Sequence, residues 1–409
     1  MTDTLSDPDG LATYPMRRQP SCPFDPPPEL ARLRAEAPVT RVRIWDDSTP
    51  WLITDYADQR AVLRDPRFSS DLSRDGFPCT TSAVKARRVN NPALITMDNP
   101  EHDRYRRMFT YDFMIKRVEA LRPRIQSIVD GLIDDLVRQG PPADLVETLA
   151  LPVPSLVICQ LLGVPYTEHD YFQERTQLIV SRDADVAQVV RATGELTEYL
   201  TELLRTKDAD PGDDLLSRLV VGQVRPGNIT LKQAADTAIL LLAAGHETTA
   251  NMIGLGTVAL LRNTDQLRIV RETEDPKVIA GTVEEMLRYL SIVHHGRRRV
   301  ATEDVEIGGQ LIRAGEGVIL AGDAANRDPS AFPGDPDQLD VLREARHHVA
   351  FGYGIHQCLG QSLARVELQV VYGTLFRRLP GLALAVPFEE LPFRNDMVIY
   401  GVHELPLTW

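Results

Sequence analysis

The chain has 409 residues, of which 43% are hydrophobic and 25% charged, and its formal charge is 45 − 58 = −13. A chain of this length can bury a large core without disulfides, so its four cysteines fit a reducing cytosol. No apolar run approaches the roughly 18 residues of a membrane helix, and the polar N-terminus shows no signal peptide. The composition therefore predicts a cytoplasmic globular protein, without a membrane anchor and without general affinity for nucleic acid.

The N-terminal part of the chain is rich in proline and shows little helical or strand periodicity. The first thirty residues are expected to lie extended on the surface. A short helix is expected at Glu29 to Ala37, followed by strands at Val39 to Ile44 and Pro50 to Thr54. Prolines then interrupt a long irregular stretch from Ser69 to Pro100, which is typical of a functional or disordered loop.

Most of the remaining chain has helical periodicity. Apolar residues recur at helical spacing from Ile125 to Leu136 and again from Leu196 to Leu204. Thr230 and Gln233 predict a capping box, which begins a long proline-free helix that ends near Asn263. The apolar character of this helix predicts that it crosses the core.

Strand signals return at Val305 to Ile307, Val318 to Leu320 and Met397 to Tyr400. The chain contains no internal repeat, low-complexity tract or convincing linker. The sequence therefore predicts one mainly α domain with small β-sheets, spanning residues 1–409.

A glycine-rich segment around Cys358 carries the strongest chemical signal. Phe351 to Gly360 read FGYGIHQCLG, and a helical pattern follows from Ser362. The glycines allow tight turns and the close approach of a large flat group, and the dipole of the following helix favours a thiolate. This arrangement suits an axial metal ligand. The alternative is a structural cysteine in a glycine-rich turn; Cys22, Cys79 and Cys159 lack such neighbours and are expected to be ordinary thiols.

The same ten residues match F-G-x-G-x-[H/R]-x-C-x-G, and here the chain resembles the cytochrome P-450 family of haem-thiolate monooxygenases. The resemblance covers nearly the whole chain and extends to soluble bacterial members that hydroxylate macrolides, sterol-like compounds and xenobiotics such as sulfonylureas. It implies the mainly α P-450 fold, with haem b between the long central helix and the cysteine loop. It identifies Cys358 as the axial ligand of the haem iron and places Phe351, Gly352 and Ala244 at the haem.

Glu285 and Arg288 lie three residues apart on an expected helix, where they face one side and can pair. By itself this spacing usually marks a solvated helix face. The resemblance implies a structural ion network with Arg343 as the third member, which holds the loop that presents Cys358.

His102 and Arg106 lie four residues apart on an expected helix, so both point to one side. The resemblance implies that they hold the haem propionates, together with Arg299 and His356. Two propionate charges inside a protein must be paired and hydrogen-bonded. Without the cysteine loop, an ordinary helix surface would be the simpler interpretation.

In the long helix, Ala243 to Thr249 read AAGHETT, so a glycine, an acid and two hydroxyls interrupt an apolar run. A threonine can bond back to the carbonyl four residues earlier and, beside a glycine, open the helix to water or dioxygen. A polar kink without function is the alternative. The resemblance assigns Glu247 and Thr248 to the oxygen-activating acid and alcohol: Thr248 hydrogen-bonds the oxygen, and Glu247 relays protons from solvent.

By resemblance, the substrate pocket is lined by parts of the stretches 71–95 and 166–192. Individual pocket residues are expected to be Leu240, Ala243, Ile292, Val293, His294, Val398 and Ile399. For His294 and its neighbour His295, a surface or loop position is the alternative. The composition of these segments predicts a bulky, largely apolar substrate with a few polar groups.

The chain has no flavin or nicotinamide fingerprint, so its electrons must come from another protein. The resemblance implies a ferredoxin with its ferredoxin reductase as the donor and dioxygen as co-substrate; we also expect a monomer. Arg104, Arg107, Lys116 and Arg117 are expected to form a basic docking patch for an acidic ferredoxin. The alternative is a solvated helix face.

Three other functions are alternatives to a monooxygenase that hydroxylates a C–H bond. A non-hydroxylating haem-thiolate protein, such as a peroxygenase, a dehydratase or a gas sensor, would share Cys358, but the pair Glu247 and Thr248 argues against a peroxygenase. A cysteine hydrolase would need Cys358 and His356 to meet and a third orienting group. A zinc site would need paired cysteine spacing, which is not present.

Overall fold

The computed structural model describes residues 10–87, 93–181 and 184–409. The chain divides into two compact units. Unit 1 comprises Met1–Asp98, Leu287–Leu339 and Ala345–Cys358, and unit 2 comprises Asn99–Met286, Asp340–Glu344 and Leu359–Trp409. Among the residues that the structure describes, no helix combines the length and the hydrophobicity that a membrane-spanning segment requires.

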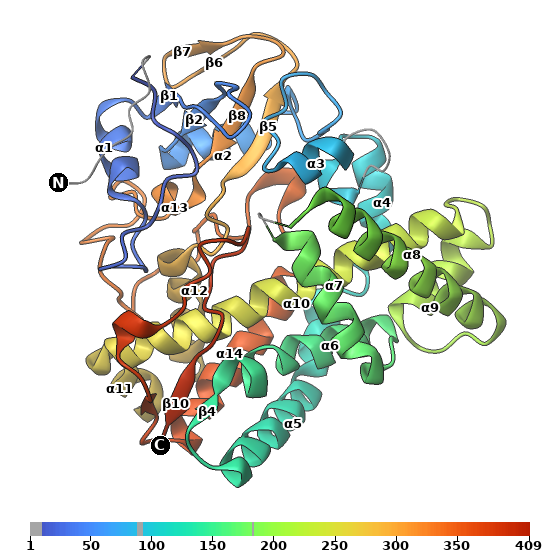
Figure 1. Cartoon of the computed structure of the whole chain (residues 1–409), viewed down its shortest axis with the longest axis vertical. Coiled ribbons are helices and arrows are strands. Elements are labelled where there is room, and N and C mark those ends of the chain that lie inside the picture. Colours follow the sequence, from blue (N-terminus) through green and yellow to red (C-terminus); the bar gives the residue numbers. More distant parts are fainter. Residues whose placement is uncertain (1–9, 88–92, 182–183) are drawn as a thin grey trace. The chain divides into compact units, whose positions relative to one another are not determined.

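Unit 1 is built on a five-stranded sheet with the order β1-β2-β8-β5-β3. Strands β2 and β8 run parallel, and the other neighbours run antiparallel (Figure 1). The elements of this unit are α1 (Pro28–Glu36), β1 (Val39–Arg41), β2 (Trp51–Ile53), α2 (Tyr56–Arg64), β3 (Phe68–Ser69), α3 (Ser82–Arg87), η1 (Leu94–Thr96), β5 (Arg297–Ala301), β6 (Val305–Ile307), β7 (Gln310–Ile312), β8 (Gly317–Leu320), α13 (Gly322–Ala325) and η5 (Gly354–His356).

The sheet of unit 1 is covered on both faces, because successive side chains of a strand point to opposite sides. Leu52 and Ile319 pack with Leu30 and Leu33 of α1 in one buried cluster. The neighbouring residues of the same strands pack in a second cluster, which includes Ile53, Val62, Leu63, Val318 and Leu320. Because both of their faces are buried, the short strands β2 and β8 are almost wholly apolar.

Unit 2 is mainly helical and contains a small three-stranded sheet with the order β4-β10-β9. Its elements are α4 (Glu101–Thr110), α5 (Ile115–Gln139), β4 (Ala143–Asp144), η2 (Val146–Ala150), α6 (Pro152–Leu162), η3 (Tyr166–Glu168), α7 (His169–Val180), α8 (Val186–Ala209), α9 (Leu215–Leu219), η4 (Val220–Val224), α10 (Leu231–Arg262), α11 (Thr264–Glu272), α12 (Pro276–Leu290), α14 (Gln361–Arg378), β9 (Ala383–Leu384), η6 (Phe388–Glu390) and β10 (Pro406–Thr408). The last residues of α12 are counted in unit 1.

Helix α10 is the long central helix that the sequence predicts, and it packs against α6, α8 and α14 (Figure 1). The predicted capping box is confirmed: Gln233 N donates to Thr230 Oγ1 at 3.2 Å, and Thr230 N donates to Gln233 Oε1 at 2.8 Å. Gly256 allows α14 to come close, because a Cβ there would lie 1.9 Å from the hydroxyl oxygen of Tyr372. That hydroxyl donates to the carbonyl of Met252 at 2.5 Å.

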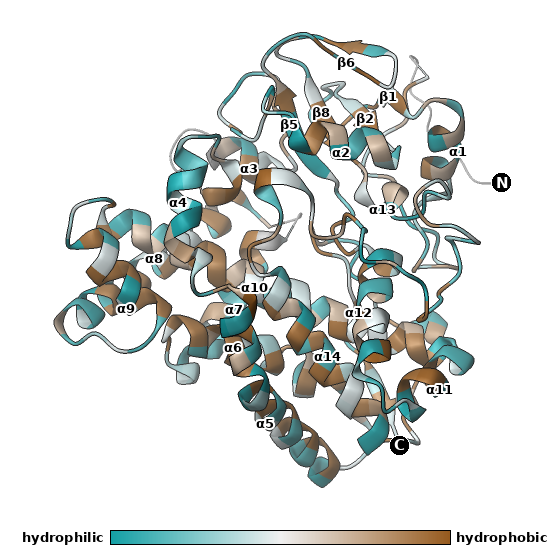
Figure 2. Cartoon of the chain, turned by 180° about the vertical axis from the view of Figure 1, so that it is seen from behind, coloured by the Kyte–Doolittle hydropathy of each residue, from teal (hydrophilic) through white to brown (hydrophobic). Residues whose placement is uncertain are grey.

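Helix α5 shows how an amphipathic pattern places a surface helix. Hydrophilic and hydrophobic residues intermingle along it in Figure 2. Its buried residues recur at helical spacing and form one stripe: Val118, Ile125, Val129, Ile133 and Leu136. The helix ends at Gln139, and Gly140 follows it with a φ of 79°, which favours glycine.

Three expectations about local structure need correction. The segment Met397 to Tyr400 is not a strand: Met397 makes only an isolated bridge with Ser181, because the chain turns at Asn395 and Asp396. The irregular stretch before α4 contains α3 and η1. The N-terminal segment is not confined to the surface, since Tyr14 is 1% exposed.

Candidate functional site

The loop around Cys358 is closed by its own backbone. Cys358 N donates to the carbonyl of Phe351 at 2.9 Å. Gly352 and Gly354 both have a φ of 73°, a region that other residues rarely adopt. A Cβ at Gly354 would also lie 2.3 Å from the carbonyl oxygen of Leu63. The glycines of the motif are therefore required by the loop conformation.

The four cysteines differ in exposure, and Cys358 is the exposed one. Cys79 and Cys159 are buried, and burial raises the pKa of Cys159 to about 11. Burial, together with a hydrogen bond to Asp25, raises the pKa of Cys22 to about 11. The thiols of Cys22 and Cys159 therefore stay protonated near neutral pH, whereas the thiol of Cys358 is accessible to a ligand.

Strand β5 carries three consecutive arginines that point to alternate sides. Arg298 donates to the carbonyls of Pro78 and Cys79 at 2.7 and 2.9 Å. Arg299, the predicted propionate ligand, is 8% exposed, and burial lowers its pKa to about 10. Its side chain therefore remains a buried cation at neutral pH.

Arg297 was missed in the sequence, although the alternation of a strand would have placed it on the side of Arg299. Its guanidinium donates to the carbonyl of Ala350 in the cysteine loop. Its Nε also lies 3.1 Å from the position that a Cβ on Gly352 would take. Burial lowers the pKa of Arg297 to about 10, and the nearby Cys358 opposes that shift. A permanent cation is thus built into the surroundings of the thiol.

The other three predicted propionate ligands lie on helical elements. His102 and Arg106 are both on α4, in unit 2, one turn apart. His102 is 1% exposed and Arg106 is partly exposed. His356 ends η5 in unit 1, two residues before Cys358, and is partly buried.

Helix α10 separates its acid from its alcohol. Thr248 Oγ1 donates to the carbonyl of Ala244 at 2.8 Å, so the predicted back-bond is present. Ala244 is exposed and Thr248 partly exposed, although both lie in the middle of this apolar helix. Glu247 is 1% exposed and forms an ion pair with Arg394 at 3.1 Å. The helix thus has an accessible face with small side chains and a buried acidic face.

The predicted structural network is buried rather than solvated. In unit 2, Arg343 Nε lies 3.4 Å from Glu285 Oε1, which also accepts from Asp340 N at 3.0 Å. Arg288 is 0% exposed. Within unit 1, its guanidinium donates to the carbonyls of Asn326, Pro336 and Gln338. The interpretation of this motif as a solvated helix face is therefore wrong.

The predicted substrate residues lie in both units. Leu240 and Ala243 on α10, and Val398 and Ile399 in the C-terminal turn, are partly buried residues of unit 2. In unit 1, Val293 is partly buried, and Ile292 and His294 are 8% and 9% exposed. His294 and His295 lie buried in a turn, so the surface alternative for them is wrong, whereas the loop position is confirmed. Residues 88–92 and 182–183 of the expected pocket segments lie outside the described residues.

The residues present suit a thiolate-ligated haem in their chemistry. An exposed thiol on a glycine loop can ligate iron, and buried guanidiniums can neutralise carboxylates.

Comparison with known proteins agrees with this chemistry. The sequence model of the family described as "Cytochrome P450" matches residues 185–380. The chain is 52% identical to cytochrome P450 GfsF of Streptomyces halstedii, with 100% of both chains covered. It is 54% identical to cytochrome P450-SU2 of Streptomyces griseolus, covering 100% of this chain and 99% of that one.

Solved structures show the same relationship. The crystal structure of GfsF has a TM-score of 0.92 at 53% identity, covering 97% of this chain and 100% of that one. The mycinamicin VIII C21 methyl hydroxylase MycCI of Micromonospora griseorubida, bound to mycinamicin VIII, has a TM-score of 0.91 at 42% identity, with 97% and 100% covered. The predicted mainly α fold is confirmed. The chain therefore belongs to the cytochrome P450 family of haem-iron monooxygenases.

Proposed function

We propose that the protein is a haem b monooxygenase that inserts one atom of dioxygen into a C–H bond of a bulky, largely apolar small molecule. Residues 1–409 would act as one catalytic domain and as a monomer. The cysteine loop carries this proposal, since it combines an exposed thiol with glycines that its conformation requires. The related MycCI is a methyl hydroxylase, which supports hydroxylation as the reaction.

Haem, when bound, would supply the activation of dioxygen by iron, with a thiolate ligand that favours O–O cleavage. Cys358 would hold the iron, and the cation of Arg297 lowers the cost of its negative charge. The propionates would be paired by His102, Arg106, Arg299 and His356.

The accessible face of α10 would serve the oxygen chemistry. Because the Thr248 hydroxyl donates its hydrogen bond to the carbonyl of Ala244, its oxygen lone pairs stay available to accept a hydrogen bond from water. Glu247 would take up and release the protons. Leu240, Ala243, Ile292, Val293, His294, Val398 and Ile399 would contact the substrate.

The test of this function is spectroscopic and chemical. The reduced protein under carbon monoxide should show the strongly red-shifted Soret band of a thiolate-ligated haem. With ferredoxin, its reductase and an apolar substrate that shifts the ferric spectrum, the product should carry one labelled atom from ¹⁸O₂. A protein that binds no haem would contradict the proposal. A red-shifted band without labelled product would instead favour the dehydratase or sensor alternative.

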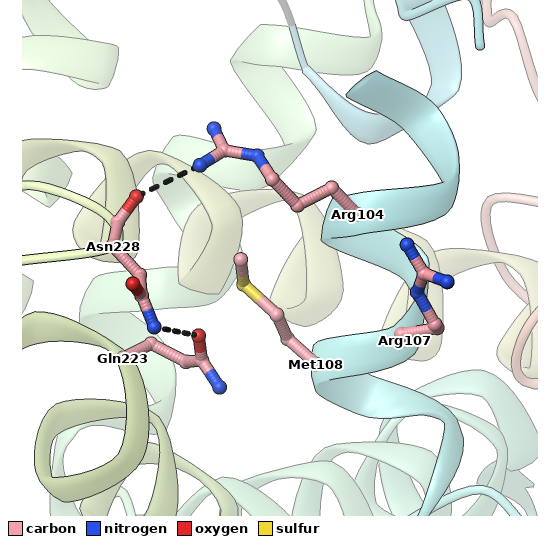
Figure 3. Close-up of a pocket in the computed structure, with 5 residues that line it drawn as sticks. All are labelled: Arg104, Arg107, Met108, Gln223 and Asn228. Atoms are coloured by element: carbon pink, nitrogen blue, oxygen red, sulfur yellow. Dashed lines mark hydrogen bonds between the residues drawn. The ribbon is translucent and has the colours of Figure 1, made fainter. Parts of the chain in front are cut away.

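The electron donor is proposed to be a ferredoxin that docks on α4 and the start of α5. A pocket of about 300 Å³ beside α4 is lined by Arg104, Arg107, Met108, Gln223 and Asn228 (Figure 3). Arg104 donates to the carbonyl of Asn228 at 3.0 Å and pairs with Glu101. Arg107 is exposed at the edge of the pocket. This basic pocket suits a carboxylate from an acidic partner.

Charge reversal tests the docking patch. The double variant Arg107→Glu with Lys116→Glu should raise the apparent KM for ferredoxin roughly 5- to 10-fold at low salt, with kcat at saturation retained. We choose Arg107 over Arg104 because the charge of Arg104 is already paired with Glu101. The effect should shrink in high salt. Arg138→Glu, which reverses an exposed charge that pairs with Asp135 at the far end of α5, controls for a charge reversal outside the patch. An equal rise in this variant would contradict a local patch.

A further inference from the structure

Glu247 belongs to a buried polar cluster that α10 forms with the C-terminal segment of unit 2. Arg394 lies 3.1 Å from Glu247 Oε2 and donates to Asn251 Oδ1 at 3.2 Å. Asn251 Nδ2 donates to the carbonyl of Glu247 at 2.7 Å and lies 3.5 Å from Oε2. His246, Glu247, Asn251 and Arg394 are each 5% exposed or less.

The C-terminal hairpin sets the position of Arg394. Arg394 N donates to the carbonyl of Gly401 at 2.9 Å, and Phe393 forms a bridge with Val402. Gly401 lies directly on the cluster, because a Cβ there would be 1.6 Å from Asn251 Oδ1. Only glycine allows this contact, so the backbone holds the guanidinium beside α10.

The two oxygens of the Glu247 carboxylate have different surroundings. Oε2 is held by Arg394 and Asn251. Oε1 is buried and has no hydrogen-bond partner among the described residues. His246 Nδ1 lies 3.9 Å from it, beyond hydrogen-bond distance, and burial lowers the pKa of His246. The neighbouring imidazole is therefore uncharged near neutral pH, and Arg394 is the cation of the cluster.

Burial without a cation would favour the neutral form of a carboxyl group, which can no longer accept a proton. Arginine stays charged in proteins and can hold one carboxylate oxygen in a fixed geometry. We propose that Arg394 is a positioning residue for proton delivery: its guanidinium pairs with the carboxylate of Glu247, fixes Oε2, and leaves Oε1 to accept each proton. Glu247 then passes the proton on and returns to the carboxylate. This inference rests on the proposed monooxygenase function.

The test compares Arg394→Met with Arg394→Lys in the haem-loaded enzyme. Arg394→Met should lower kcat about 10- to 100-fold, the scale of one general acid–base group. Its solvent deuterium isotope effect on kcat should increase, whereas the KM for substrate should stay within about twofold of wild type. Arg394→Lys keeps the charge and should recover most of the kcat.

Arg262→Met is the matched control. Arg262 also connects α10 to the C-terminal segment, with its guanidinium 4.6 Å from the ring centroid of Phe388. It lies 11 residues, about three helical turns, beyond Asn251 on α10, so this variant should keep the wild-type kcat and isotope effect. An equal loss in Arg262→Met would show that packing, and not positioning, is responsible.

Arg394→Met leaves the buried carboxylate of Glu247 without its cation, so a second comparison uses a background in which this carboxylate is replaced by an amide. In the Glu247→Gln background, Arg394→Met should change kcat less than about twofold, because Arg394 acts through Glu247. A further large drop in that background would overturn the proposal, as would a wild-type kcat and isotope effect in Arg394→Met itself. A wild-type protein without the red-shifted band or labelled product would contradict the proposed function instead.

Discussion

Replacing Cys358 by alanine is expected to abolish both the red-shifted Soret band of the reduced, carbon monoxide-bound protein and hydroxylation. The reason is that the band and the push toward O–O cleavage both require a thiolate on the iron. The absorption spectrum of the reduced protein and product analysis by mass spectrometry measure the two effects. A Cys358→Ala protein that keeps the band would show that another residue ligates the iron.

Two further variants separate ligation from folding. Cys358→His keeps an iron ligand on the loop and should bind haem without the red shift, because imidazole carries no negative charge. Cys22→Ala removes a partly buried thiol that pairs with Asp25 and should keep the wild-type band. Loss of the band in Cys22→Ala would contradict the assignment of the ligand to Cys358.

The Arg288→Met variant should lower the free energy of unfolding by about 3–5 kcal/mol, as expected when a buried charge network loses one member. Arg288 is 0% exposed. Its guanidinium donates to the carbonyls of Asn326 and Pro336 at 2.8 Å each and to that of Gln338 at 3.3 Å. Methionine fills similar space but removes the hydrogen bonds that Arg288 donates to these carbonyls. Urea denaturation followed by circular dichroism measures the change.

An exposed arginine of the same unit provides the control. Arg32 on α1 pairs with Glu36 at 2.9 Å, but their side chains are 57% and 62% exposed. Arg32→Met should therefore change the free energy of unfolding by less than about 0.5 kcal/mol. Similar midpoints for the two variants would contradict a supporting role of Arg288.

Local patterns in the sequence were enough to predict much of this protein. The capping box of Thr230 and Gln233, the apolar stripe of α5 and the back-bond of Thr248 all depend on residues within a few positions of one another. The conformation of the cysteine loop also depends on nearby residues, because the positive φ at positions 352 and 354 favours glycine. Such patterns are visible without the fold.

Other features depended on neighbours that the sequence does not reveal. Strand β5 was missed because three arginines hide its alternation, and the proposed strand at Met397 to Tyr400 lacks a continuous partner. The burial of Arg288 is decided by carbonyls about 38 to 50 positions further along the chain.

The sequence by itself determined the family, and it predicted the cysteine for the haem iron and the acid and alcohol of α10. Only the tertiary structure decided how that acid is held. Glu247 meets Arg394 because the C-terminal hairpin returns to α10, and Gly401 allows its backbone to touch Asn251. A charge pair between such distant positions has no local signature, since any buried carboxylate could be matched by any arginine that the fold brings within about 4 Å.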